Sequence, residues 1–122
     1  MQKMLLSINP EHVKNIVSGK KKVEYRRVRC KRDIDSIVIY STSPEKKIIG
    51  EVEVKRVIEG TLEEIWNLTK DIGCISYDFF KKYYFGKNEA VAYELGTLEL
   101  YPKPKELSEY GIKSAPQSYI YI

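Results

Sequence analysis

The chain of 122 residues is predicted to form an α+β domain, with five to seven strands in a mixed, curled sheet or small barrel and about three helices packed on it. Its length fits a single domain over residues 1–122. A hydrophobic fraction of 43% is enough for a core and too high for a disordered chain. Most of the expected strands lie too close together in sequence for repeated parallel crossovers through helices.

The first strand is expected at residues 5–8, and a helix follows it. Asn9 can cap that helix, Pro10 suits its first position, and Gly19 supplies a stop signal. His12 falls in the first turn, where we expect a surface histidine.

Three further strands are expected before the middle of the chain, at residues 22–28, 37–40 and 48–58. Polar and apolar side chains alternate in the first of them, which is typical of a strand. Val52 and Val54 alternate with charged side chains in the last, so one face of that strand is expected to be buried and the other wet.

Two more helices are expected in the second half. Thr61 and Glu64 form a capping box that opens the first, and Gly73 separates it from a second helix capped by Ser76 and ended by Gly86. The aromatic side chains at helical spacing in this second helix are expected to belong to the core.

The last third is expected to contain mainly strands. Residues 89–100 fit one or two strands, residues 101–105 form a stiff connector with two prolines, and residues 117–122 alternate as a final strand.

The charge pattern points to an anionic partner. The net charge is only +4, but eight Lys and Arg residues lie between residues 20 and 32, with Glu24 as the one acid among them. Lys22, Glu24 and Arg26 are expected on one strand face, where cations attract phosphate and a carboxylate accepts hydrogen bonds from a base or amine. Together with ten tyrosines, this patch suggests nucleic acid. The alternatives are a solvated strand edge and a Glu24–Arg26 ion pair without a ligand.

Other classes of protein are disfavoured by the sequence. No apolar run approaches the ~20 residues that span a bilayer, and the first residues do not form a signal peptide, so a cytoplasmic protein is expected. Cys30 and Cys74 are therefore expected to be free thiols. With one histidine and no Cys/His cluster, neither a metal site nor a cofactor is expected.

The run Ser18-Gly19-Lys20-Lys21-Lys22-Val23-Glu24-Tyr25-Arg26 is similar to the Gly-Lys-Lys-x-x-Glu-x-Arg signature of the ASCH domain, a branch of the PUA-like β-barrel superfamily. Residues 39–44 and 48–51 resemble the family's strand, small-residue loop and next strand, and the aromatic segment before Gly86 sits where members place a helix. The resemblance covers nearly the whole chain. It implies a PUA-like barrel with a helix across one mouth and the signature lining a cleft between them.

Because family members are implicated in RNA binding, RNA modification and transcription-linked roles, the resemblance implies an RNA- or nucleotide-binding domain. Some bacterial members hydrolyse an acetylated cytidine with a lysine that Lys21 matches, and Asp71 is the nearest match to their acidic partner. Those enzymes have a threonine where this chain has Glu24, which is a departure from the amidohydrolase pattern.

In a binding protein, the cations would neutralise phosphate, Glu24 would accept hydrogen bonds from donors on a base edge, and Tyr40 would stack on a base. In an enzyme, a desolvated Lys21 would act as base or nucleophile and Glu24 would relay protons. Three functions stay open: RNA or nucleotide binding, a small amidohydrolase or ribonuclease, and a protein-interaction module. The expected binding residues are Lys20, Lys21, Glu24, Arg26, Arg27, Tyr40, Ser41 and Ser43.

Overall fold

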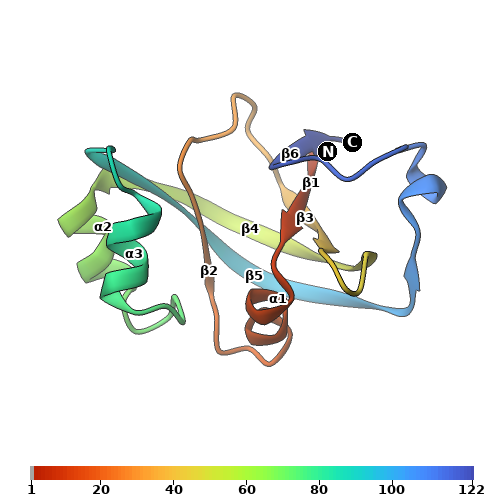
Figure 1. The fold of residues 1–122 in the computed structure, drawn as a ribbon, viewed down its shortest axis with the longest axis horizontal. Helices are drawn as coiled ribbons and strands as arrows, with labels where there is room; N and C mark the ends of the chain where they lie inside the picture. Colours follow the sequence, from red (N-terminus) through yellow and green to blue (C-terminus); the bar gives the residue numbers. More distant parts are fainter. Residues whose placement is uncertain (1) are drawn as a thin grey trace.

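The computed structural model describes residues 2–122 as one six-stranded mixed sheet with three α-helices (Figure 1). The sheet curls into a half-barrel, which confirms the expected α+β, PUA-like fold. In chain order, the elements are β1 (Lys3–Ile8), α1 (Pro10–Val17), β2 (Val23–Arg26), β3 (Ser36–Ser41), β4 (Lys47–Thr61), α2 (Leu62–Thr69), α3 (Tyr77–Tyr83), β5 (Glu89–Lys105), a 3₁₀ helix (Leu107–Tyr110) and β6 (Tyr119–Tyr121).

The strand order across the sheet is β2-β5-β4-β3-β1-β6. Only β1 and β3 pair in parallel; the other neighbours are antiparallel. The two longest strands, β4 and β5, have 15 and 17 residues and three register shifts in their pairing. Such irregularities bend a strand and increase its twist, so they let two long strands curl around the core (Figure 1).

Local sequence signals place the helices correctly. The side chain of Asn9 accepts a hydrogen bond from the Glu11 backbone N–H, and Ser76 caps α3 in the same way through the N–H of Phe79. Thr61 and Glu64 form both bonds of the capping box at the start of α2.

The connector expected at residues 101–105 is instead the end of β5, where Lys105 pairs with Ile48. β2 pairs with β5 only as far as Glu94, so at residues 101–105 the edge of β5 that faces away from β4 has no partner strand. A strand edge without a partner tolerates prolines. The strand expected at residues 22–28 is shorter, because its pairing with β5 ends at Arg26.

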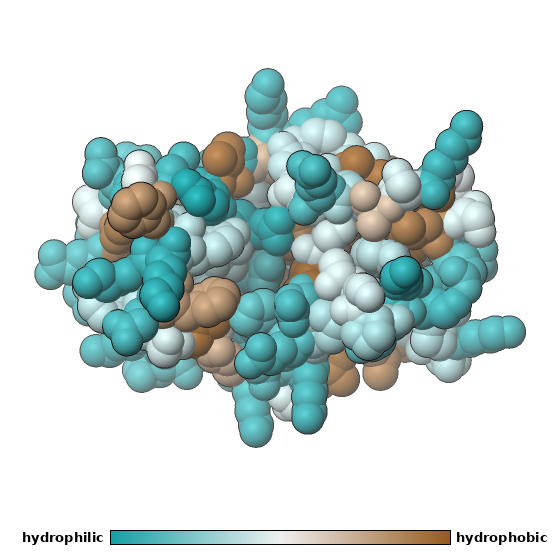
Figure 2. Space-filling view, in the orientation of Figure 1, coloured by the Kyte–Doolittle hydropathy of each residue, from teal (hydrophilic) through white to brown (hydrophobic). Residues whose placement is uncertain are grey.

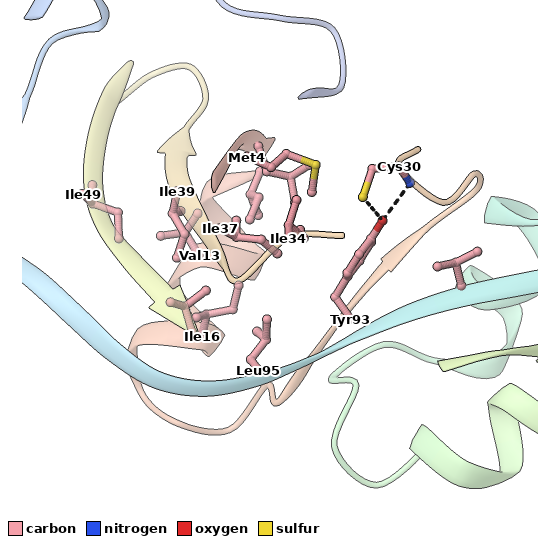
Figure 3. Close-up of a cluster of buried hydrophobic side chains, with 14 residues drawn as sticks. Met4, Val13, Ile16, Cys30, Ile34, Ile37, Ile39, Ile49, Tyr93 and Leu95 are labelled. Atoms are coloured by element: carbon pink, nitrogen blue, oxygen red, sulfur yellow. Dashed lines mark hydrogen bonds between the residues drawn. The ribbon is translucent and has the colours of Figure 1, made fainter. Parts of the chain in front are cut away.

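Apolar side chains form three clusters around the sheet. The largest lies between α1 and the concave sheet face and includes Met4, Ile16 and Ile39 (Figure 3). At its border, the buried Tyr93 hydroxyl accepts a hydrogen bond from the Cys30 N–H at 3.0 Å and donates to Cys30 Sγ at 3.1 Å (Figure 3). Phe80 and Tyr84 are buried in a second cluster beneath α2 and α3, with Tyr83 packed against it, whereas Phe79 is exposed, so the expectation that these aromatic side chains belong to the core holds only in part. The third cluster lies between β1, β3 and the 3₁₀ helix.

Hydrogen bonds link β2 and the loop after it to the β6 edge of the sheet. The Arg26 guanidinium, at the end of β2, donates to the hydroxyl of Ser118 just before β6 at 2.6 Å. Further along, the Arg32 N–H donates to the Tyr121 hydroxyl at 3.1 Å, and the Arg32 guanidinium lies over that ring. These contacts, called the edge contacts below, bring the ends of the strand order close to each other.

Hydrophilic side chains cover most of the face seen in Figure 2, with apolar patches between them that include one over the α2–α3 end. Among residues 2–122, no helix has the length and apolar character needed to cross a membrane. Both cysteines are free thiols, Cys30 buried and Cys74 exposed.

Candidate functional site

A cavity of about 180 Å³ lies where the end of β1, the start of α1, β2 and α3 meet. Three charged side chains from the signature segment, Lys21, Glu24 and Arg26, line it together. We call this cavity the Lys21 pocket. It lies beside the edge contacts, because Arg26 belongs to both.

Lys21 is a buried cation, with only 3% of its surface exposed. Its Nζ donates a hydrogen bond of 2.6 Å to the Gly73 carbonyl and lies 5.0 Å from the centre of the Tyr25 ring. Burial lowers the pKa of Lys21, and the nearby Glu24 carboxylate opposes that shift without cancelling it. The pocket therefore contains an amine that gives up its proton more readily than an exposed lysine does.

Glu24 and Arg26 form a partly enclosed ion pair on the pocket wall. Arg26 Nη1 donates to Glu24 Oε2 at 3.3 Å, and the two side chains are 16% and 7% exposed. Each lies two residues from the other along β2, so both project to the same face of the strand. A carboxylate has several acceptor sites and a guanidinium five donors, so both groups can still bind a ligand.

His12 also lines the pocket, and the expectation of a surface histidine is wrong. Its ring is half-buried and meets the Phe79 ring edge-on at 5.8 Å. Within residues 2–122, its buried Nδ1 has no hydrogen-bond partner. Burial and the nearby Lys21 charge both lower the pKa of His12, which favours the neutral ring.

Aromatic side chains close the opposite side of the pocket. Tyr25, Phe79 and Tyr83 line it, and the Tyr83 hydroxyl donates to the Tyr25 carbonyl at 3.1 Å. Tyr25 is fixed from below, because its hydroxyl donates to Thr69 Oγ1 at 2.7 Å. Flat apolar walls beside a few charged groups are the usual make-up of a site for a small ligand or for part of a larger one.

Several residues expected at the site lie elsewhere. Lys20, Lys22 and Asp71 are exposed and do not line the pocket. Lys22 lines a second groove, which Lys21 also lines but Glu24 and Arg26 do not. Arg27 is exposed and donates to the Phe85 carbonyl.

Tyr40, Ser41 and Ser43, which were expected to bind the ligand, also lie outside the pocket. Tyr40 is 5% exposed and packs in the third apolar cluster, so its ring is not available to stack a base. Ser43 is exposed, whereas Ser41 is buried beside Ile8, which does line the pocket. Ser7, Ile8 and Asn9 line the pocket instead.

Sequence reasoning missed His12, Phe79 and Tyr83 as pocket residues. In the sequence, neither a single histidine nor aromatic residues at helical spacing indicate a binding site. The family resemblance could have indicated them, because it implies a helix across the mouth of the barrel, next to the signature.

A family model described as ASCH domain matches residues 6–112 of this chain. The chain belongs to the ASCH domain family. The signature that led to this expectation supplies Lys21, Glu24 and Arg26 to the pocket.

Curated relatives of this ASCH domain include proteins with quite different names. An ASCH domain-containing ribonuclease from Zymomonas mobilis is 33% identical over 92 residues, which cover 75% of this chain and 62% of that protein. Large ribosomal subunit protein uL22 from Ureaplasma parvum is 28% identical over 120 residues, 98% of this chain. The chain spans only 39% of the length of that ribosomal protein.

Solved structures show the same fold. The crystal structure of ASCH from Zymomonas mobilis superimposes with a TM-score of 0.89 at 28% identity, covering 98% of this chain and 87% of that one. The N-terminal domain of Staphylothermus marinus McrB has a TM-score of 0.55 at 14% identity, over 88% of this chain and 77% of the other, and is similar in fold alone.

Proposed function

We propose that this ASCH domain binds single-stranded RNA and holds part of one nucleotide in the Lys21 pocket. The observation that carries the proposal is that a buried lysine, a buried glutamate and a largely buried arginine converge on one cavity. Burying charges is costly, and structures keep such groups mainly where they bind or react. The ribonuclease name of the 33% identical relative supports RNA as the ligand.

The size and chemistry of the pocket suit one base or sugar. Its volume of about 180 Å³ is below the range of roughly 300–1,000 Å³ that is usual for whole drug-sized ligands, so the rest of the strand must lie outside. Glu24 accepts hydrogen bonds from amino or imino groups of a base, and Arg26 donates to a phosphate or to a base carbonyl. Phe79 and Tyr83 offer ring surfaces to the base.

Binding is tested by fluorescence anisotropy with a labelled RNA octamer over a series of salt concentrations. Each phosphate contact contributes about 0.7 to the slope of log affinity against log salt for a single strand. Lys21→Met is expected to weaken binding at every salt concentration. Lys22→Met is the matched control, because it removes the same charge from the neighbouring exposed residue and is expected to change affinity much less.

The result that contradicts the proposal is equal loss from both lysine variants, or no RNA affinity even at low salt. Equal loss would mean that the chain attracts RNA through general charge, without using the pocket.

We also propose that the pocket cleaves the bound RNA, because its buried lysine has a lowered pKa and a relative is named as a ribonuclease. In this reaction, the deprotonated form of the Lys21 amine takes the proton of a ribose 2′-hydroxyl, and the 2′ oxygen attacks the adjacent phosphorus. The 5′ oxygen of the next nucleotide leaves and takes a proton from water, which yields a 2′,3′-cyclic phosphate and a free 5′-hydroxyl. Arg26 stabilises the charge that develops on the phosphate.

Lys21→Arg separates binding from cleavage. Guanidinium stays protonated near neutral pH and cannot act as a base, so RNA affinity is expected to persist while cleavage is lost. Product analysis by liquid chromatography detects the cyclic phosphate, and urea unfolding checks that the variant folds. Cleavage by Lys21→Arg at the wild-type rate contradicts this role. In parallel, acetylcytidine should yield no free cytidine, because Glu24 replaces the threonine of the amidohydrolase pattern.

A further inference from the structure

We propose that the RNA strand leaves the Lys21 pocket over a second contact surface that binds the neighbouring nucleotide. This surface consists of Arg27, Lys82, Phe85 and Lys87 and is called the Phe85 surface below. The inference rests on the proposed function and adds to it where the strand runs, with Phe85 as the ring on which the next base stacks.

Phe85 is the most exposed large apolar side chain among residues 2–122, with 83% of its surface exposed to solvent. The preceding residue, Tyr84, is fully buried, whereas Phe85 lies in the turn after α3 with its ring outside the core. An exposed aromatic ring beside a binding pocket is a stacking surface, since every base has a flat face that can lie on it.

The backbone around Phe85 is held in place. The Phe85 N–H donates to the Lys82 carbonyl at 3.2 Å, and the Lys87 N–H donates to the Tyr84 carbonyl at 2.9 Å. Arg27 Nη2 donates to the Phe85 carbonyl at 3.2 Å from the other side. A ring on a fixed backbone loses less conformational entropy when it binds a base than a ring on a loose loop does.

The Phe85 surface adjoins the pocket. Tyr83 lines the pocket two residues before Phe85, and two residues span at most roughly 7 Å. The Tyr84 hydroxyl donates to the Arg26 carbonyl at 2.9 Å, which fixes the end of α3 against the end of β2. Arg26 therefore faces the pocket while the next residue, Arg27, contacts Phe85.

The charge of the Phe85 surface matches a phosphate backbone. Within residues 2–122, Arg27, Lys82 and Lys87 form no ion pair with a carboxylate. Arg27 uses one guanidinium donor on the Phe85 carbonyl and keeps others for a ligand. Cationic residues close in sequence or contact to an exposed ring are the combination with which single-stranded nucleic acids are bound, whereas the centre of a protein interface is depleted of charge.

The experiment compares nucleoside monophosphates with an RNA octamer, using wild type and Phe85→Ala. The monophosphates reach only the pocket, so Phe85→Ala should leave their affinity unchanged. Octamer affinity should fall by about 5- to 150-fold, which corresponds to ~1–3 kcal/mol for one stacked base. Phe85→Trp should restore it, and Leu68→Ala, which removes another exposed apolar side chain on α2, is the matched control.

The outcomes separate this inference from the proposed function. If Lys21→Met weakens the binding of both ligands while Phe85→Ala alters neither, the pocket function stands and the Phe85 surface is overturned, leaving a protein contact as the use of that ring. If Phe85→Ala weakens monophosphates and octamer equally, the ring is part of the pocket structure and the inference also fails. If wild type binds neither ligand, the proposed function itself fails.

Discussion

Gly73→Ala is expected to disturb the pocket from beneath, because Gly73 lies in close contact with Tyr25 and its carbonyl holds Lys21. A Cβ on Gly73 would lie 2.8 Å from two carbons of the Tyr25 ring and closer still to the hydroxyl. Since carbon atoms pack at about 3.5–4.0 Å, the ring or the backbone must move by about 1 Å. Gly73 is not among the glycines with positive φ, so the cost comes from this clash and not from backbone strain.

The ring has little freedom to move. Tyr25 is 5% exposed, donates to Thr69 Oγ1, and meets the Phe80 ring edge-on at 5.5 Å. Overpacking of this kind typically costs about 1–3 kcal/mol of unfolding free energy. If the backbone moves instead, the carbonyl shifts away from Lys21 Nζ, and RNA affinity falls as well.

Urea unfolding and RNA titration measure the two effects. Tyr25→Phe removes the atom nearest to the new methyl group, so Gly73→Ala should cost less in that background than in wild type. If Gly73→Ala costs the same in both backgrounds, or leaves stability within about 0.5 kcal/mol and RNA affinity unchanged, the packing argument is wrong.

Three further predictions concern stability, each followed by urea unfolding. Burial lowers the pKa of Lys21 from the ordinary 10.5, so the folded chain binds fewer protons than the unfolded chain between those two values. Wild-type stability should therefore rise relative to Lys21→Met as pH increases through that window, and a constant difference would contradict it. Thr61→Ala removes the side-chain cap of α2, one of the two bonds of its capping box, and should cost about 1 kcal/mol, with Ser108→Ala as an exposed control. Tyr93→Phe leaves the N–H of Cys30 without its partner and should cost ~1–3 kcal/mol; a loss below about 0.5 kcal/mol would show that another acceptor replaces it.

The helices were predictable from sequence because their signals are local. Asn9, Thr61 and Ser76 each cap a helix through a side chain only two or three residues away from its partner. The end of β5, which contains two prolines, was not predictable from sequence. It is a strand because Lys105 pairs with Ile48, more than 50 residues away. Propensity within the segment carries no information about that partner.

The candidate site was predictable only along one segment. Glu24 and Arg26 share a face because strand geometry sets a period of two. The period does not extend to Lys22, since β2 begins at Val23 and the N–H groups of Lys20 and Lys21 both bind the Asn15 carbonyl in a turn. That turn buries Lys21 and leaves Lys22 exposed. The aromatic residues Phe79 and Tyr83 come from α3, whose position relative to β2 the sequence alone does not give.

Arg26 connects pocket occupancy to closure of the sheet. Among residues 2–122, β2 and β6 are the two ends of the strand order, and the edge contacts between them are made by side chains and single backbone groups. A ligand anion that takes the Arg26 Nη2 donor now bound to Ser118 would compete with that hydroxyl. Ligand binding and breakage of the edge contacts are therefore linked. If bound ligand favours the broken contacts by a certain free energy, broken contacts favour ligand binding by the same free energy. Substitutions at Ser118, outside the lining of the pocket, would then change RNA affinity without touching RNA.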